Sequence, residues 1–296
     1  MTRVAVGVAA GIVVVFIMAA SRVLGLFLIA VCHLIAMGEY LRLAEPRLPD
    51  DIRRTLWILV SAQFAVAAAI MATYVAPSDF LFTRIAQFPE CGILRLMAAI
   101  GACALLTWIT IFLAVSYFMV RRHPHGDFPI SAGLHVLTAI GTVYVGLLSL
   151  ALLYAAGSWN IWFLPMLLSW GADAGAFFTG RSVGKSLLAP TVSPKKTVEG
   201  LTGAMLTGAV ALPAFLYFSG SPLAAAGPAA ALFQALAGCS IAGLGHLGDL
   251  FISILKRAHH QKESGVFLPG HGGILDKIDS LLIVSPIVAL LAFALS

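Results

Sequence analysis

Three aspartates lie where long apolar stretches of the chain end or begin. Asp249 closes one stretch, while Asp276 and Asp279 open the next one and are three residues apart. Residues at that spacing share a helix face, and two adjacent carboxylates repel each other unless a cation or basic groups neutralise them. Magnesium favours one or two carboxylates together with substrate phosphate oxygens. The pattern predicts a metal site at Asp249, Asp276 and Asp279, with simple helix capping by one of the last two as the alternative.

A further carboxylate, Asp173, lies inside an apolar stretch. An ionised aspartate in hydrocarbon costs at least ~2.5 kcal/mol on insertion scales, so it is retained where a cation or an internal polar network compensates it. Asp173 is placed among the substrate-binding residues, with internal compensation alone as the alternative.

Two lysines adjoin a predicted helix start further along the chain. The segment Ser193-Pro-Lys195-Lys196-Thr197 directly precedes an apolar stretch, and Thr197 has a side chain suited to cap a helix there. Lysines beside the positive N-terminal end of a helix suit a phosphate ligand. The alternative is that they only mark a cytoplasmic loop.

A glycine-rich turn, Pro269-Gly-His271-Gly272-Gly273, lies between the apolar stretch that Asp249 closes and the one that Asp279 opens. Glycine permits close approach of a ligand to the backbone. Histidine can donate a hydrogen bond to phosphate or shuttle a proton. The turn therefore predicts a phosphate-binding segment, with an ordinary turn histidine as the alternative for His271.

The elements that must position these residues are membrane spans. Hydrophobic residues make up 60% of the 296 residues, charged residues only 10%, and the mean hydropathy is +0.98. A soluble domain averages about 25% charged residues, so this composition predicts an all-α polytopic integral membrane protein. Nine apolar segments are long enough to span, each needing about 20 residues. They are residues 4–20, 23–40, 55–76, 96–120, 131–155, 159–178, 200–219, 229–249 and 279–295.

The basic residues predict the orientation of these nine spans. Fifteen Lys and Arg residues fall in loops on one side and three on the other, which places the N-terminus in the cytoplasm. Residues 4–20 are interpreted as a retained span rather than a signal peptide. Only Ser21-Arg22 separates the first two spans, so a helical hairpin is expected, with one long tilted helix as the alternative. The net charge of +5 lies in short loops and does not indicate nucleic acid binding.

The segment from Ser253 to Asp279 resembles the signature of the phosphatidate cytidylyltransferase family. The matching residues are Ser253-x-Leu-Lys256-Arg257-x4-Lys262-Glu263-x-Gly265-x2-Leu268-Pro269-x-His271-Gly272-Gly273-Ile274-x-Asp276-Lys277-Ile278-Asp279. The stretches Ser193-Pro-Lys-Lys-Thr-x-Glu-Gly200 and Gly248-Asp249-Leu are also similar to that family. The chain departs from the usual family pattern at Ile252, Glu263 and Lys277.

The resemblance implies a nine-span enzyme of the cell (inner) membrane, with its active site on the cytoplasmic side. It implies a homodimer that uses Mg²⁺, with K⁺ as a second cation, to join CTP to phosphatidic acid and release pyrophosphate. Residues 1–130 would be a transmembrane scaffold and residues 131–296 the catalytic region. Catalytic roles are expected for Asp249, Lys256, Asp276 and Asp279, the three aspartates holding metal. Substrate-binding roles are expected for Asp173, Arg181, Ser193, Lys195, Lys196, Ser253, Arg257, Lys262, His271, Gly272 and Gly273.

Other functions remain open at this point. A divergent relative could act on another lipid phosphate. An ion-coupled transporter would use intramembrane carboxylates but predicts inverted repeats, and the polar motifs of this chain have no counterpart in its first half. CDP-alcohol phosphotransferases and prenyltransferases use longer aspartate-rich motifs, which this sequence lacks.

Overall fold

The computed structural model describes residues 2–44, parts of 50–65, 130–156, and 161–294 with gaps at 191, 221–223, 225–226, 259–260 and 266–271. Two compact units, residues 1–156 and 157–296, make up the chain, and each is described by itself. The predicted span 96–120 and most of the span 55–76 lie outside the described residues, as does His271.

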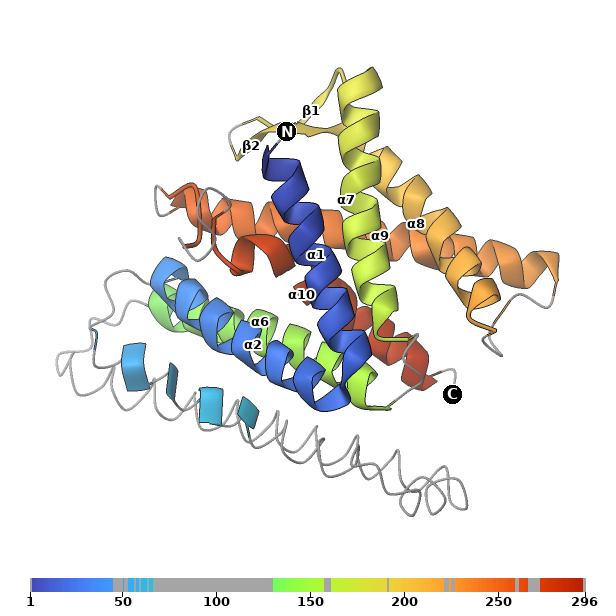
Figure 1. Cartoon of the computed structure of the whole chain (residues 1–296). Helices are drawn as coiled ribbons and strands as arrows, with labels where there is room; N and C mark the ends of the chain where they lie inside the picture. Colours follow the sequence, from blue (N-terminus) through green and yellow to red (C-terminus); the bar gives the residue numbers. More distant parts are fainter. Residues whose placement is uncertain are drawn as a thin grey trace, which may run out of the picture. The chain divides into compact units, whose positions relative to one another are not determined.

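The described helices of the first unit are α1 (Thr2–Ala20), α2 (Arg22–Ala44) and α6 (Ile130–Ala156), with α2 packed against α6 (Figure 1). The helical ladder breaks at Ser21, so residues 2–44 form two helices rather than one long one. The hydroxyl of Tyr154 on α6 lies 2.6 Å from the carbonyl oxygen of Met18 and 3.0 Å from that of Ser21. These contacts tie α6 to the junction of α1 and α2.

The second unit runs from α7 to α10 and carries all the predicted site residues (Figure 1). Its elements are α7 (Phe163–Val183), β1 (Leu187–Ala189), β2 (Ser193–Thr197), α8 (Val198–Phe218), α9 (Pro228–Ala258) and α10 (Leu275–Ala294). Helix α8 packs between α7 and α9, while α10 packs against both α7 and α9. The strands form an antiparallel hairpin that pairs Leu187 with Thr197 and Ala189 with Ser193. The three-residue length of β1 and the polar residues of β2 give no strand signal in the sequence.

Glycine allows the helices of this unit to approach closely. A β-carbon added to Gly208 on α8 would overlap the carbonyl oxygen of Gly238 on α9, and the reverse substitution would overlap the carbonyl oxygen of Gly208. Small residues at such crossings are typical of membrane helix pairs, in which van der Waals packing replaces the hydrophobic effect. This crossing fixes where the more distal residues of α9 lie relative to α8.

The described residues have the architecture of an all-α membrane protein with one small hairpin. Seven of the nine predicted spans fall on described residues, and each coincides with a helix. By length and composition, three helices in the described part of the chain could cross a membrane: Val23–Leu43, Val198–Phe218 and Pro228–Arg257. Large apolar side chains on these helices are exposed, including Phe233 and Val210, as expected for lipid-facing surfaces. The division into a scaffold (residues 1–130) and a catalytic region (residues 131–296) stays a prediction about function. By packing, the chain divides into two compact units after Ala156.

Candidate active site

The entry into α8 fixes the position of one lysine. Thr197 has extended backbone angles (φ −117°, ψ 156°), and its hydroxyl accepts a hydrogen bond from the amide of Gly200 at 3.0 Å. Thr197 is thus the predicted N-cap. Side chains alternate along β2, so Lys195 is exposed while Lys196 is turned inward. The Lys196 ammonium lies 2.9 Å from Asp249 Oδ2 and donates to the carbonyl oxygen of His246 at 3.1 Å.

Two of the three predicted metal ligands meet between α9 and α10. The carboxyl groups of Asp249 and Asp279 lie within hydrogen-bonding reach of each other, and Asp279 is only 7% exposed. Close helix approach makes this possible, because Gly248 packs against Ile283 and a β-carbon at Gly248 would overlap that side chain. The hydroxyl of Ser253, one turn after Asp249, donates to Asp249 Oδ1 at 3.4 Å. Two carboxylates so close require a positive neighbour or a shared proton, and Lys196 supplies one positive charge.

Asp276 belongs to a different group of contacts. Its Oδ1 is 2.5 Å from the ammonium of Lys256, and its Oδ2 accepts from the amide (2.8 Å) and hydroxyl (3.0 Å) of Ser264 and from the amide of Gly273 (3.1 Å). Asp276 precedes the predicted span 279–295. Burial opposes ionisation of Asp276, but the hydrogen bonds and the Lys256 charge outweigh it and hold the pKa of this carboxyl below its ordinary value. Asp276 and Asp279 lie three residues apart on α10, as predicted, yet their side chains have different partners.

The Asp276 contacts also explain one glycine of the predicted turn. Gly272 has φ +82°, a left-handed conformation that favours glycine, and a β-carbon there would overlap Asp276 Oδ2. Gly273 then presents its amide to the same carboxylate. The two glycines therefore shape the start of α10 around Asp276.

An internal polar network surrounds Asp173 on α7. The buried hydroxyls of Ser169 and Ser280 are 2.6 Å apart, and Ser280 donates to Asp173 Oδ2 at 3.4 Å. Nδ1 of His246 lies 3.8 Å from Asp173 Oδ1, and 43% of the Asp173 side chain is still exposed. Asp173 is also near enough to Asp279 to interact with it electrostatically. The network joins α7, α9 and α10.

The remaining predicted basic residues do not converge on one point. Arg257 donates to the carbonyl oxygens of Val192 (3.1 Å) and Gln261 (3.0 Å), which ties the end of α9 to the hairpin. The side chains of Arg181, Lys195 and Lys262 are exposed, as is that of Arg257. Ser193 lies in β2, half-buried and paired in register with Ala189.

Sequence analysis missed three polar residues of this region: His246, Ser264 and Ser280. Two of them had a detectable signal, because His246 lies three residues before Asp249 on the same helix face and Ser280 directly follows Asp279. Ser264 had none, since its contact with Asp276 depends on how the loop folds back.

The donor set fits a magnesium ion at two residues rather than three. No group of three His, Cys, Asp or Glu side chains in the described residues is arranged to hold a metal. Asp249 and Asp279 nevertheless supply adjacent carboxylates, and magnesium is commonly held by one or two carboxylates plus substrate phosphates. Asp276 fits less well, because Lys256, Ser264 and Gly273 already occupy its oxygens.

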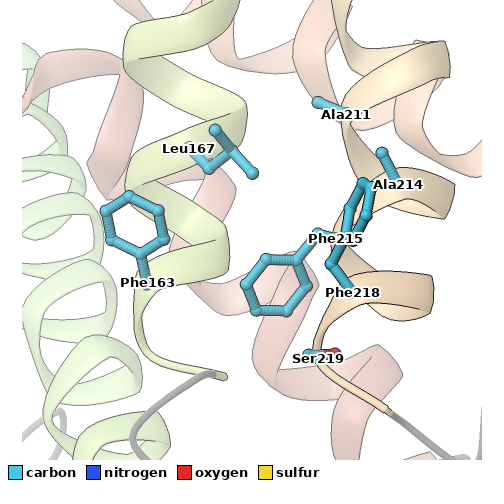
Figure 2. Close-up of a pocket in the computed structure, with 7 residues that line it drawn as sticks. All are labelled: Phe163, Leu167, Ala211, Ala214, Phe215, Phe218 and Ser219. Carbon is cyan, nitrogen blue, oxygen red and sulfur yellow. The ribbon is translucent and has the colours of Figure 1, made fainter.

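An apolar groove of about 490 Å³ lies apart from these residues, between the start of α7 and the end of α8 (Figure 2). Figure 2 shows the rings of Phe163 and Phe215 on either side of it. Its lining residues are Phe163, Leu167, Ala211, Ala214, Phe215, Phe218 and Ser219. Such a lining suits hydrocarbon rather than a charged nucleotide.

Comparison with known proteins relates the whole chain to one family. The sequence model described as "Cytidylyltransferase family" matches residues 1–295. A phosphatidate cytidylyltransferase of Bacillus subtilis is 30% identical over 289 residues, which cover 96% of this chain and 94% of the relative. The phosphatidate cytidylyltransferase of Pseudomonas aeruginosa is 43% identical over 129 residues (44% of this chain, 46% of the relative). That of Haemophilus influenzae is 41% identical over 120 residues (40% and 41%).

Proposed function

The chain belongs to the cytidylyltransferase family, and we propose that it transfers the cytidylyl group of CTP to phosphatidic acid, giving CDP-diacylglycerol and pyrophosphate. The observation that carries the proposal is the arrangement of Lys196, Asp249 and Asp279 at the meeting of β2, α9 and α10. Acidic and basic groups there can gather phosphate anions around a cation. The apolar helices that hold them keep the site beside lipid.

Asp249 and Asp279 are the proposed magnesium ligands, and potassium is the proposed second cation. Bound magnesium would neutralise phosphate oxygens of CTP as negative charge moves towards the leaving pyrophosphate. The proximity of the two carboxylates and the burial of Asp279 support this assignment. The potassium site rests on the family resemblance alone.

The reaction joins two anions. The phosphate of phosphatidic acid attacks the α-phosphorus of CTP in line, forming a new P–O bond as the bond to pyrophosphate breaks. A phosphomonoester is largely ionised at neutral pH, so no strong general base is needed. Positioning and charge neutralisation therefore provide most of the catalysis, as in other phosphoryl transfers.

Separate tasks follow for the basic residues. Lys196 holds Asp249 in place and adds positive charge beside it. Lys256, buried and paired with Asp276, fixes the end of α9 against the start of α10. The exposed Arg181, Lys195 and Lys262 are open to phosphate groups arriving from the aqueous side.

The proposed setting is a nine-span protein of the inner membrane with a cytoplasmic N-terminus. The excess of Lys and Arg in alternate loops supports it, and it places the site on the side where CTP is present. Phosphatidic acid then enters laterally with its acyl chains in the bilayer. A homodimer is also proposed, on the family resemblance.

The test is CTP-dependent synthesis of a CDP-lipid by the purified, detergent-solubilised protein. We expect radiolabel from CTP to enter a lipid whose mass is that of CDP-diacylglycerol, only with magnesium and phosphatidic acid present. Asp249→Asn is the matched control, since it keeps the size of the side chain and removes its charge. Incorporation that requires a different lipid phosphate would replace phosphatidic acid as substrate, and no incorporation by folded wild-type protein would reject the function.

A further inference from the structure

His246 on α9 is a buried histidine without hydrogen bonds at its ring. It is 6% exposed, and neither ring nitrogen has a hydrogen-bond partner among the described residues. It lies three residues before Asp249, on the side of α9 that faces the acidic residues.

An arrangement of this kind costs stability, because each buried polar atom loses its water without gaining a partner. Buried polar groups in native proteins are nearly always satisfied, and exceptions call for an explanation such as a functional role. A leucine of similar size would be the more stable choice at this place.

The neighbours of His246 are themselves site residues. Its Nδ1 lies 3.8 Å from Asp173 Oδ1, which is too long for a hydrogen bond but close enough to become one with a small shift. Its backbone carbonyl oxygen accepts from Lys196. Its imidazole is also near enough to Asp249 to interact with it electrostatically.

Asp173 already has one fixed oxygen. Ser280 donates to Oδ2, and Ser280 is in turn held by Ser169. A second donor at Oδ1 would lock the carboxylate plane. Hydrogen bonds in active sites commonly shorten when substrate binds.

We propose that His246 is a positioning residue, whose Nδ1–H donates to Asp173 and orients that carboxylate to bind the nucleoside part of CTP. This inference rests on the proposed function. An ionised carboxylate only accepts hydrogen bonds, so its ligand must be a donor. Phosphatidic acid has both glycerol hydroxyls esterified and an ionised phosphate, whereas CTP carries ribose hydroxyls and the cytosine amino group. The partly exposed Asp173 therefore matches CTP rather than the lipid.

The experiment compares three replacements of His246 in the purified, full-length protein. His246→Asn keeps a donor at the position of Nδ1, His246→Gln moves it to the position of Nε2, and His246→Leu removes it. Steady-state CDP-lipid synthesis gives KM for CTP and for phosphatidic acid separately. Thermal melting in detergent reports the fold.

We expect the KM for CTP to rise at least tenfold in His246→Leu and His246→Gln and less than threefold in His246→Asn. The KM for phosphatidic acid should change less than twofold in all three. His246→Leu should melt at the wild-type temperature or higher, which a merely structural histidine would not allow. If His246→Leu does not fold, the Asn and Gln pair carries the test.

A double-variant cycle that combines Asp173→Asn with His246→Leu tests whether the two residues act together. Asp173→Asn should raise the KM for CTP as His246→Leu does, and the double variant should be no worse than Asp173→Asn alone, because His246 acts through Asp173. Independent, multiplicative losses would overturn the inference, as would an unchanged KM for CTP in His246→Leu or equal loss in the Asn and Gln variants. Absence of CTP-dependent synthesis in the wild type would instead reject the proposed function.

Discussion

The ammonium of Lys196 lies 2.9 Å from the carboxylate of Asp249 and connects the hairpin to α9. Asp249 in turn lies beside Asp279 on α10. One lysine thus faces a pair of acids, an arrangement to which a divalent cation can bind. The ion pair therefore links the position of the hairpin to the proposed metal site.

Lys196→Met is expected to lower CDP-lipid synthesis by about 100-fold, the magnitude typical of losing one charge-stabilising donor in an active site. The change leaves Asp249 without its positive partner and removes one of the contacts between the hairpin and α9. The measurement is the initial rate at saturating CTP and lipid. Lys195→Met is the matched control, because Lys195 is the adjacent residue of β2 and is exposed. Equal losses in the two variants would contradict a specific role for Lys196.

Asp279→Asn is expected to raise the magnesium concentration needed for half-maximal activity and to lower the maximal rate, because one of two adjacent carboxylates is lost. Asp249→Asn should behave in the same way. A magnesium titration of activity for each variant provides the measurement. An unchanged half-maximal concentration in both variants would remove these residues from the metal site.

Asp276→Asn is expected to reduce stability while leaving the half-maximal magnesium concentration unchanged, since Asp276 pairs with Lys256, Ser264 and Gly273. Removing one partner of a buried ion pair costs roughly 3–5 kcal/mol, and the partial exposure of Asp276 reduces this figure. Thermal melting and the same titration measure the two effects. A shift in magnesium dependence as large as that of Asp279→Asn would return Asp276 to the metal site.

Acid sensitivity gives a second measure of the same contacts. The pKa of Asp276 in the folded protein lies below its ordinary value of 3.8. Its stabilising contribution is therefore present above that value and is lost as the pH falls towards the folded-state pKa. The melting temperature of the wild type should fall more steeply on acidification than that of Asp276→Asn. Parallel curves would show that the carboxylate contacts contribute little.

Gly208→Ala is expected to destabilise the protein by about 1–3 kcal/mol, the usual cost of overpacking, because the new methyl would overlap Gly238 and Ala242. The control is Gly171→Ala on α7, where an added β-carbon finds only ordinary contact with Thr207 at 3.8 Å. That control should be neutral or stabilising, since alanine favours a helix. The measurement is the melting temperature of each variant, which should be lower for Gly208→Ala than for Gly171→Ala. Equal values would contradict the tight crossing of α8 and α9.

Local features of the sequence sufficed to predict the helices of the described residues, the N-cap and the family. Hydropathy over about 20 residues determines where a helix must form in lipid, whatever packs against it. The cap at Thr197 depends on residues three positions apart, so its contact was also predictable. The pairing of Asp249 with Asp279 was expected in outline, because one closes a predicted span and the other opens the next.

Only the tertiary structure decided which partner each polar side chain meets. Asp276 and Asp279 share a helix, yet one contacts Lys256 and the other Asp249, because the loop around Ser264 folds back on the first and α9 crosses at the second. His246 lies against Asp173 because α7 and α9, which are separated along the chain by the hairpin and α8, pack against each other. Such contacts depend on crossing angles and glycine approaches between distant segments, and no local pattern of residues encodes them.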